Sequence, residues 1–169
     1  MQIWNSGPET PGDDKKACYR DLADQLDALL TDEDDPIATL ANAAAAIYHA
    51  LPRLNWAGFY LLRDTTLVLG PFQGKPACTR IPIGRGVCGT AAAAGHSVLV
   101  PDVHDFPGHI ACDTASRSEL VTPLLRAGTV FGVLDLDSPH RARFDAEDQA
   151  GCEALAAVIA RHLPEAWPA

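Results

Sequence analysis

Apolar side chains recur at helical spacing in three stretches of the chain. In residues 14–30 they form a single stripe, made by Cys18, Leu22, Leu26 and Leu29 or Leu30. This is the pattern of an amphipathic helix. Asp35 before Pro36 is typical of a helix start and predicts a second helix that ends near Leu51. A further helix is expected to run to about Leu163, with Asp145 as N-cap and Asp148 at its third position.

The residues between these helices follow strand patterns. Strands are predicted over 55–62 and 66–69, joined by a turn near Asp64, and over 97–100, 119–125 and 129–137. A short helix is predicted over 87–94, ending at Gly95. Residues 70–86 and 101–116 are expected to be irregular, and loops as long as the second are often functional. Together, these elements predict one α+β domain over 14–169 with a mostly antiparallel sheet, preceded by a flexible tail over 1–13.

The charge balance narrows the classes of partner. The 169 residues carry 13 Lys and Arg against 22 Asp and Glu, which gives a formal net charge of −9. We expect no nucleic acid as partner, because binding to its phosphates needs a surplus of basic residues. We expect no membrane as partner, because that needs a basic surface or a long apolar span. The first residues lack the basic and apolar regions of a signal peptide, so a cytoplasmic protein is expected.

Five cysteines in a reducing compartment favour free, catalytic or metal-binding thiols over a structural disulfide framework. Cys18 and Cys152 lie on helix stripes and are expected to be buried apolar side chains. Cys78, Cys88 and Cys112 lie in the glycine-rich or irregular middle of the chain. These three favour redox chemistry, since mobile loops can bring two sulfurs within bonding distance.

Cys88 is predicted near a helix start, where amides and the helix dipole favour a thiolate. A zinc site that includes His104 or His109 beside Cys112 is a competing interpretation. The sequence has no CxxC or HxxxH spacing to support it. We therefore expect neither a metal nor a cofactor.

Strand alternation places Asp135 and Asp137 on one face of the strand predicted over 129–137. The hairpin register then decides the position of Glu119. A three-residue loop over 126–128, with glycine last, sets Glu119 opposite Asp135, whereas a two-residue turn sets it opposite Leu136. We predict the three-residue loop. Three clustered carboxyl groups should raise at least one pKa and provide a proton donor, although a solvent-facing acidic strand end fits the pattern equally well.

Two further features indicate a ligand site. Trp56, Gly58 and Tyr60 share a strand face, where the aromatic rings either pack in the core or form a wall for an apolar ligand group. The glycine-rich stretch over 83–89 leads into a helix start, whose amides can hold a carboxylate or phosphate. It lacks the lysine of a P-loop.

Together, five segments resemble the free methionine-(R)-sulfoxide reductases, a family of small GAF-domain enzymes. The resemblance covers the chain from about Asp14 to Leu163, and the tail lies outside it. The segments are NWAGFYL at 55–61, LGPFQGKPACTR at 69–80, GRGVCGTAAA at 84–93, PDVHDFPGHIACDTASRS at 101–118 and GVLDLDS at 132–138.

The resemblance implies a single GAF domain with a central antiparallel sheet and helices on both faces. It implies reduction of free L-methionine (R)-S-oxide to L-methionine, with thioredoxin as electron donor and a homodimer as the assembly. The attacking thiol would be Cys112, the resolving thiol Cys78, and Cys88 would take part in recycling. The family's carboxylates, among which we seek the proton donor, fall on Glu119, Asp135 and Asp137, and its aromatic pocket on Trp56 and Tyr60.

A different class of function is kept beside this one. GAF folds host many ligands, so the chain can also be a sensor that binds a small molecule or reports oxidation without catalysis. Sensors of this kind usually sit in longer chains with an output domain. The length of this chain therefore favours the enzyme.

Overall fold

The computed structural model describes residues 14–110 and 113–165. Three long helices begin close to the predicted starts: α1 (Lys15–Leu30), α2 (Pro36–Ala50) and α4 (Ala146–Arg161). The Asp14 carboxylate accepts a hydrogen bond from the Ala17 amide, and Asp35 accepts from two amides at the start of α2. At α4, Asp145 and Asp148 form a reciprocal capping box. Local side-chain chemistry thus sets these helix starts, and the three predictions are confirmed.

The strands form one six-stranded sheet in the order β3-β2-β1-β6-β5-β4, and every pairing is antiparallel. Their bounds are β1 (Trp56–Arg63), β2 (Thr66–Gly74), β3 (Arg80–Pro82), β4 (Val98–Val100), β5 (Ser118–Arg126) and β6 (Thr129–Ser138). A fourth helix, α3 (Gly86–Ala94), precedes β4, and a short 3-10 helix, η1 (Val103–Asp105), follows it.

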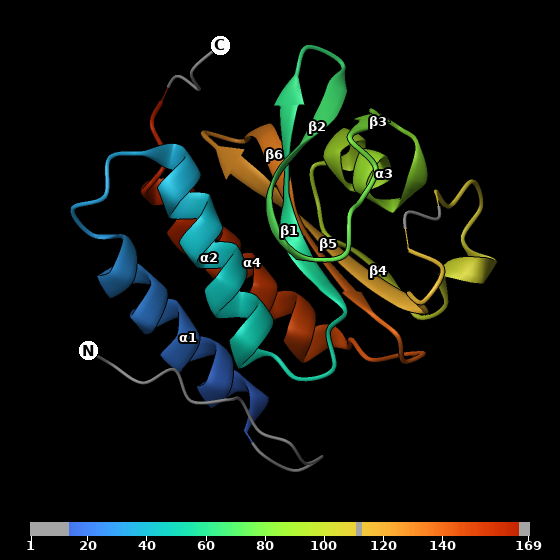
Figure 1. Ribbon diagram of the computed structural model, residues 1–169, viewed down its shortest axis with the longest axis horizontal. Coiled ribbons are helices and arrows are strands. Elements are labelled where there is room, and N and C mark those ends of the chain that lie inside the picture. Colours follow the sequence, from blue (N-terminus) through green and yellow to red (C-terminus); the bar gives the residue numbers. More distant parts are fainter. Residues whose placement is uncertain (1–13, 111–112, 166–169) are drawn as a thin grey trace.

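Figure 1 shows α1, α2 and α4 on one side of the sheet and α3 on the other. The sheet therefore separates two apolar clusters, one beneath the three long helices and one beneath α3. Strand β6 contributes to both sides, since Leu134 and Leu136 face the long helices while Val133 and Asp135 face α3. The predicted α+β architecture, with helices on both faces, is confirmed. Among the described residues, no helix is long and apolar enough to cross a membrane.

The hairpin of β5 and β6 differs from the prediction. The loop has two residues, Ala127 and Gly128, both with positive φ, and Arg126 pairs with Thr129. This is the geometry of a type I′ turn, which suits the strand twist. The register then shifts by one residue, because Leu125 pairs with Val130 but Leu124 pairs with Gly132. The predicted three-residue loop is therefore wrong. A β-bulge follows the turn, and nothing in the local sequence pattern indicates it.

Glu119 consequently pairs with Asp137 and not with Asp135. The error amounts to two residues, and strand side chains alternate with a period of two. The face of the sheet is therefore unchanged, and the predicted clustering of three carboxyl groups on one face is confirmed. Without the bulge, the two-residue turn would have set Glu119 opposite Leu136, on the wrong side for such a cluster.

Residues 70–86 are more regular than expected. Strand β2 continues to Gly74 because it keeps pairing with β1 past an irregularity between Gly58 and Tyr60. The three residues of β3 then pair with the start of β2. These pairings come from contacts distant in sequence, which override the glycine and proline content that favoured a loop.

Candidate active site

Neighbouring strands align the candidate residues in two rows on the α3 side of the sheet. The first row crosses β5, β6 and β1 through Glu119, Asp137 and Trp56. The second row places Asp135 of β6 beside Gly58 of β1. Since directly opposed residues in an antiparallel pair project to the same face, the three acids and the indole are held close together by backbone pairing.

Gly58 is required by the aromatic packing beside the acids. A Cβ at this position would overlap the Cβ of Phe72 and lie 2.7 Å from Cη2 of Trp56. The absent side chain lets the Trp56 ring lie across the sheet, stacked on Phe72 at 5.2 Å and on Tyr60 at 5.9 Å between centroids. The Trp56 indole N–H donates to the Lys75 carbonyl, and the Tyr60 hydroxyl donates to the Cys78 carbonyl. The rings are thus fixed both by stacking and by hydrogen bonds.

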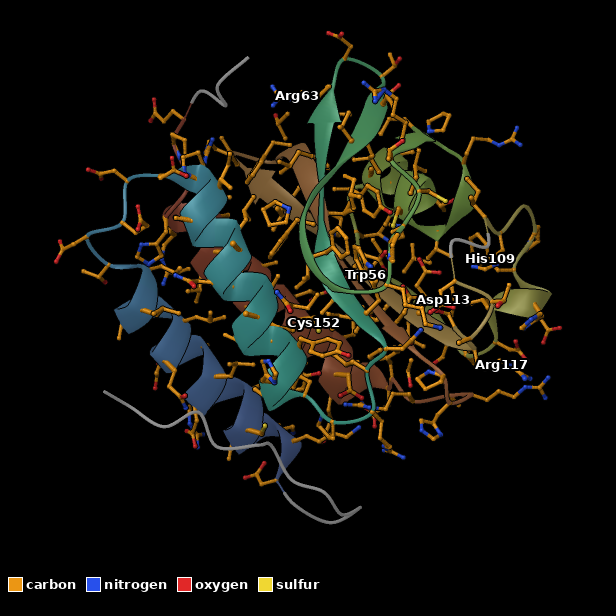
Figure 2. All side chains as sticks on the ribbon, in the orientation of Figure 1. Trp56, Arg63, His109, Asp113, Arg117 and Cys152 are labelled. Atoms are coloured by element: carbon orange, nitrogen blue, oxygen red, sulfur yellow. The ribbon has the colours of Figure 1, made fainter. Side chains whose placement is uncertain are left out.

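A narrow pocket with a cavity volume of about 40 Å³ opens above these aromatic rings. That is room for a few water molecules. In Figure 2, Trp56, His109 and Asp113 lie on the α3 side of the sheet, and Cys152 lies on the side of the long helices. The described residues that line the pocket are Trp56, Tyr60, Pro76, Ala77, Ile81, Gly86, Val87, Cys88, His109, Ile110, Asp113, Ser116, Glu119, Asp135 and Asp137.

Glu119 and Asp135 are buried and Asp137 is half-buried, and loss of contact with water is the largest cause that raises their pKa values. The pKa of Asp135 rises to about 7, and those of Glu119 and Asp137 rise well above the usual range, with Asp135 adding repulsion. The predicted rise is confirmed, although desolvation contributes more than the neighbouring charges. The cluster can therefore hold protons at neutral pH, and the exposed acidic strand end is excluded.

Asp135 has one oxygen without a partner. Its Oδ2 lies 3.3 Å from the Cys88 sulfur, whereas Oδ1 is buried and makes no hydrogen bond to any described residue. A buried carboxyl oxygen left unpaired is unfavourable. Because Asp135 lines the pocket, this oxygen is a natural partner for a cationic or hydrogen-bond-donating ligand group.

Cys88 differs from the prediction in its charge. It lies in the first turn of α3, as expected, but its side chain is buried and its sulfur lies 3.3 Å from Asp135 and 3.9 Å from Glu119. Burial, followed by the adjacent acids, raises the pKa of this thiol well above its ordinary value. The expected thiolate was therefore wrong, because desolvation and like charge outweigh the helix N-terminus.

The long segment between β4 and β5 supplies two further groups, His109, which the sequence offered only as a possible zinc ligand, and Asp113, which it did not select. His109 places Nε2 3.7 Å from Oε2 of Glu119, and burial lowers its pKa, which favours the neutral imidazole. Asp113 accepts from the amide of Ala115, which lowers its pKa. It also accepts a hydrogen bond from Asn55. An ionised carboxylate thus lies at the pocket beside the protonated ones, and only the HIACD segment itself could have drawn attention to it.

The cysteines fall into two groups. Cys78 is disulfide-bonded, whereas Cys18, Cys88 and Cys152 carry free thiols. Cys152 is fully buried in α4, as predicted, and Cys18 is half-buried. Cys78 adjoins the pocket, because Pro76 and Ala77 line it and Tyr60 donates to the Cys78 carbonyl. Cys112, the expected attacking thiol, lies outside the described residues.

Known proteins are similar to this chain in sequence and in fold. The profile of the GAF domain family matches residues 37–163. Free methionine-R-sulfoxide reductase of Escherichia coli is 53% identical over 149 residues, covering 88% of this chain and 90% of that protein.

Two solved structures resemble the fold closely. Free methionine-R-sulfoxide reductase from Neisseria meningitidis, in complex with its substrate, has a TM-score of 0.86 at 45% identity and covers 95% of each chain. A Burkholderia vietnamiensis protein described as a candidate GAF sensor has a TM-score of 0.86 at 57% identity, covering 89% of this chain and 96% of that one. The chain, whose GAF-domain sheet carries a pocket lined by three acidic residues, belongs to the free methionine-R-sulfoxide reductase family.

Proposed function

We propose that the protein reduces free L-methionine (R)-S-oxide to L-methionine in this pocket, through a cysteine thiol and with thioredoxin as reductant. One observation carries the proposal. A disulfide-bonded cysteine, Cys78, adjoins a pocket floored by three carboxyl groups whose pKa values are raised. This combines a redox-active sulfur with a proton source, which are the two requirements for reducing a sulfoxide by a thiol. The Escherichia coli and Neisseria relatives carry the name of this activity.

The substrate's polar ends match the two sides of the pocket. The ammonium group pairs with Asp135, whose Oδ1 has no other partner among the described residues and whose pKa of about 7 lets it ionise. The substrate carboxylate lies at the first amides of α3, at Gly86 and Val87, both of which line the pocket. The methyl group packs on Trp56. Because both backbone ends of the amino acid are held, a methionine sulfoxide inside a polypeptide is excluded.

Cys112 is the proposed attacking thiol, and Glu119 the proton donor. The Cys112 sulfur bonds to the sulfoxide sulfur while Glu119, whose pKa is raised by burial and by Asp135, protonates the sulfoxide oxygen. The oxygen passes to Cys112 as a sulfenic acid, and methionine leaves with two more electrons. The Cys78 thiol then displaces the hydroxyl as water and forms a disulfide.

Thioredoxin completes the cycle. Its two thiols reopen the disulfide by exchange and become a disulfide themselves, so each turnover consumes one dithiol. Cys88, protonated and beside the acids, takes part in recycling. We further propose that the enzyme is a cytoplasmic homodimer, as the family resemblance implies; sedimentation at micromolar concentration tests the assembly.

A coupled assay tests the reaction. NADPH oxidation with thioredoxin and its reductase should require the R epimer of free methionine sulfoxide, and neither the S epimer nor a peptide-bound sulfoxide should support it. Cys112→Ser should abolish turnover, and Cys78→Ser should leave one stoichiometric turnover per chain. Cys18→Ser is the matched control, because Cys18 lies on the far side of the sheet, and it should retain full activity.

The sensor remains the second candidate, favoured by the description of the Burkholderia relative. The same assay separates the two. A sensor would bind methionine sulfoxide or another small molecule without thioredoxin-dependent turnover. Full turnover in Cys112→Ser would contradict the proposed mechanism.

A further inference from the structure

We propose that the pocket is also a zinc site, formed by Cys88, Glu119 and Asp135, and that a bound zinc ion excludes the amino-acid substrate. Among the described residues, these three are brought together so that one ligand atom from each lies within 4.8 Å of the others. They come from α3, β5 and β6, so no spacing along the chain predicts the group. This is why the sequence, judged by ligand spacing, favoured no metal.

The distances fit tetrahedral coordination. A thiolate at about 2.3 Å and a carboxylate oxygen at about 2.1 Å from a tetrahedral zinc ion lie about 3.6 Å apart. The Cys88 sulfur lies 3.3 Å from Oδ2 of Asp135 and 3.9 Å from Oε1 of Glu119, on either side of that value. Shifts of a few tenths of an ångström would therefore accommodate the ion.

A second observation points to a ligand here. Asp135 is 5% exposed, and its Oδ1 is buried without a hydrogen-bond partner among the described residues. His109 places an imidazole nitrogen 3.7 Å from Oε2 of Glu119, but it is not one of the three residues whose ligand atoms lie within 4.8 Å of one another. A thiolate with carboxylate donors selects zinc over magnesium or calcium. On binding, the Cys88 thiol loses its proton to solvent, since the metal is bound by the thiolate.

Exclusion of substrate follows from shared ligands, and this part rests on the proposed function. Asp135 and Glu119 cannot coordinate zinc and also hold the substrate ammonium and sulfoxide oxygen. Linkage then requires that each ligand weaken the other's binding equally. Zinc would therefore hold the enzyme inactive until a chelator removed it.

Cobalt and zinc titrations test the site without relying on activity. The full chain carrying Cys78→Ser and Cys112→Ser leaves Cys88 as the one cysteine that lines the described pocket. Cobalt(II) should then give a thiolate charge-transfer band, and zinc should displace it at one ion per chain. Adding Cys88→Ser should abolish the band and weaken zinc binding by at least about tenfold. Adding Asp135→Asn should weaken zinc binding similarly, which provides a second variant should the first fail to fold, and adding Cys18→Ser should change nothing.

Absence of binding, or zinc affinity unchanged in both Cys88→Ser and Asp135→Asn, would overturn the site. Free methionine sulfoxide added to the same titration should weaken zinc binding. Unchanged affinity there would overturn the exclusion while leaving the site. Failure of the proposed function shows separately, as absent turnover of the zinc-free wild-type protein.

Discussion

The two faces of the sheet are built from the same strands but differ in polarity, because one packs in an apolar core and the other carries acidic residues at a pocket. On the side of α1, α2 and α4, Leu134 and Leu136 of β6 join a continuous apolar core. On the side of α3, Asp135 and Asp137 of the same strand line a pocket, and Asp135 is buried beside the Cys88 thiol. One face gains stability from apolar burial, and the other keeps carboxyl groups that water would otherwise ionise. Residues that pack in the apolar core and residues that line the pocket therefore alternate along β6.

The largest expected effect lies on the polar face. Glu119→Gln keeps the shape of the side chain but removes the acid, so kcat/KM for free methionine-(R)-sulfoxide should fall by about 10² to 10⁴. The free energy of unfolding at pH 7 should not fall, because burial raises the pKa of Glu119 and disfavours its ionised form, whereas Gln carries no charge. Coupled kinetics and denaturant unfolding measure the two. An unchanged kcat/KM would remove Glu119 from the reaction.

The matched change on the apolar face is Leu134→Ala. Leu134 is fully buried, so its truncation should lower the free energy of unfolding by about 2–5 kcal/mol. Activity of the folded fraction should not change, because the side chain points away from the pocket. Urea unfolding and assays well below the midpoint test this. A loss of activity without a loss of stability would contradict the separation of the two faces.

Gly58→Ala tests whether the aromatic wall depends on a missing side chain. The added Cβ would displace Trp56 or Phe72, at a cost of about 1–3 kcal/mol in stability. Because the Trp56 ring is proposed to contact substrate, KM should rise more than kcat falls. Near-ultraviolet circular dichroism reports the ring positions, and an unchanged spectrum and KM would show that the wall tolerates the methyl group.

The last comparison of the two faces is a pH dependence of stability. Burial raises the pKa of Asp135 from 3.8 to about 7, so the folded state binds an extra proton between these limits. Its contribution therefore makes stability fall as pH rises from about 4 to about 7, by at most about 1.4 kcal/mol per pH unit. Asp135→Asn should remove this slope in denaturant unfolding series.

Asp145, on the other side of the sheet, provides the opposite sign. Hydrogen bonds from Lys15 and from α4 amides lower its pKa to about 2, in opposition to the burial that would raise it. Its contribution is present above about pH 4 and is lost as pH falls towards 2. Asp145→Asn should therefore lower stability above about pH 4 and leave it unchanged near pH 2. Identical profiles for the two variants would contradict the assignment of opposite shifts.

The parts predicted from sequence are those governed by local chemistry. Asp35 before Pro36 and the Asp145–Asp148 box set helix starts through contacts within a few residues. Alternation along β6 also placed the acids on one face. That result survived a wrong hairpin loop, since an error of two residues preserves the face of a strand.

The parts that sequence reasoning missed depend on contacts between distant segments. The extension of β2 to Gly74 needs β1, and the bulge between Leu124 and Leu125 appears only in the paired strands. The charge state of Cys88 follows from acids on β5 and β6, which helix position alone does not indicate. Asp113 became a candidate only when the structure placed it beside Asn55 and the pocket.

The proposed reaction transfers oxygen from the substrate to a cysteine at the pocket. Reduced protein mixed with one equivalent of free methionine-(R)-sulfoxide, without thioredoxin, tests it directly by mass spectrometry and amino-acid analysis. We expect one methionine per chain and loss of two hydrogens, with peptide mapping that joins Cys78 to Cys112. Methionine formed without any change in cysteine oxidation, or no methionine at all, would contradict it.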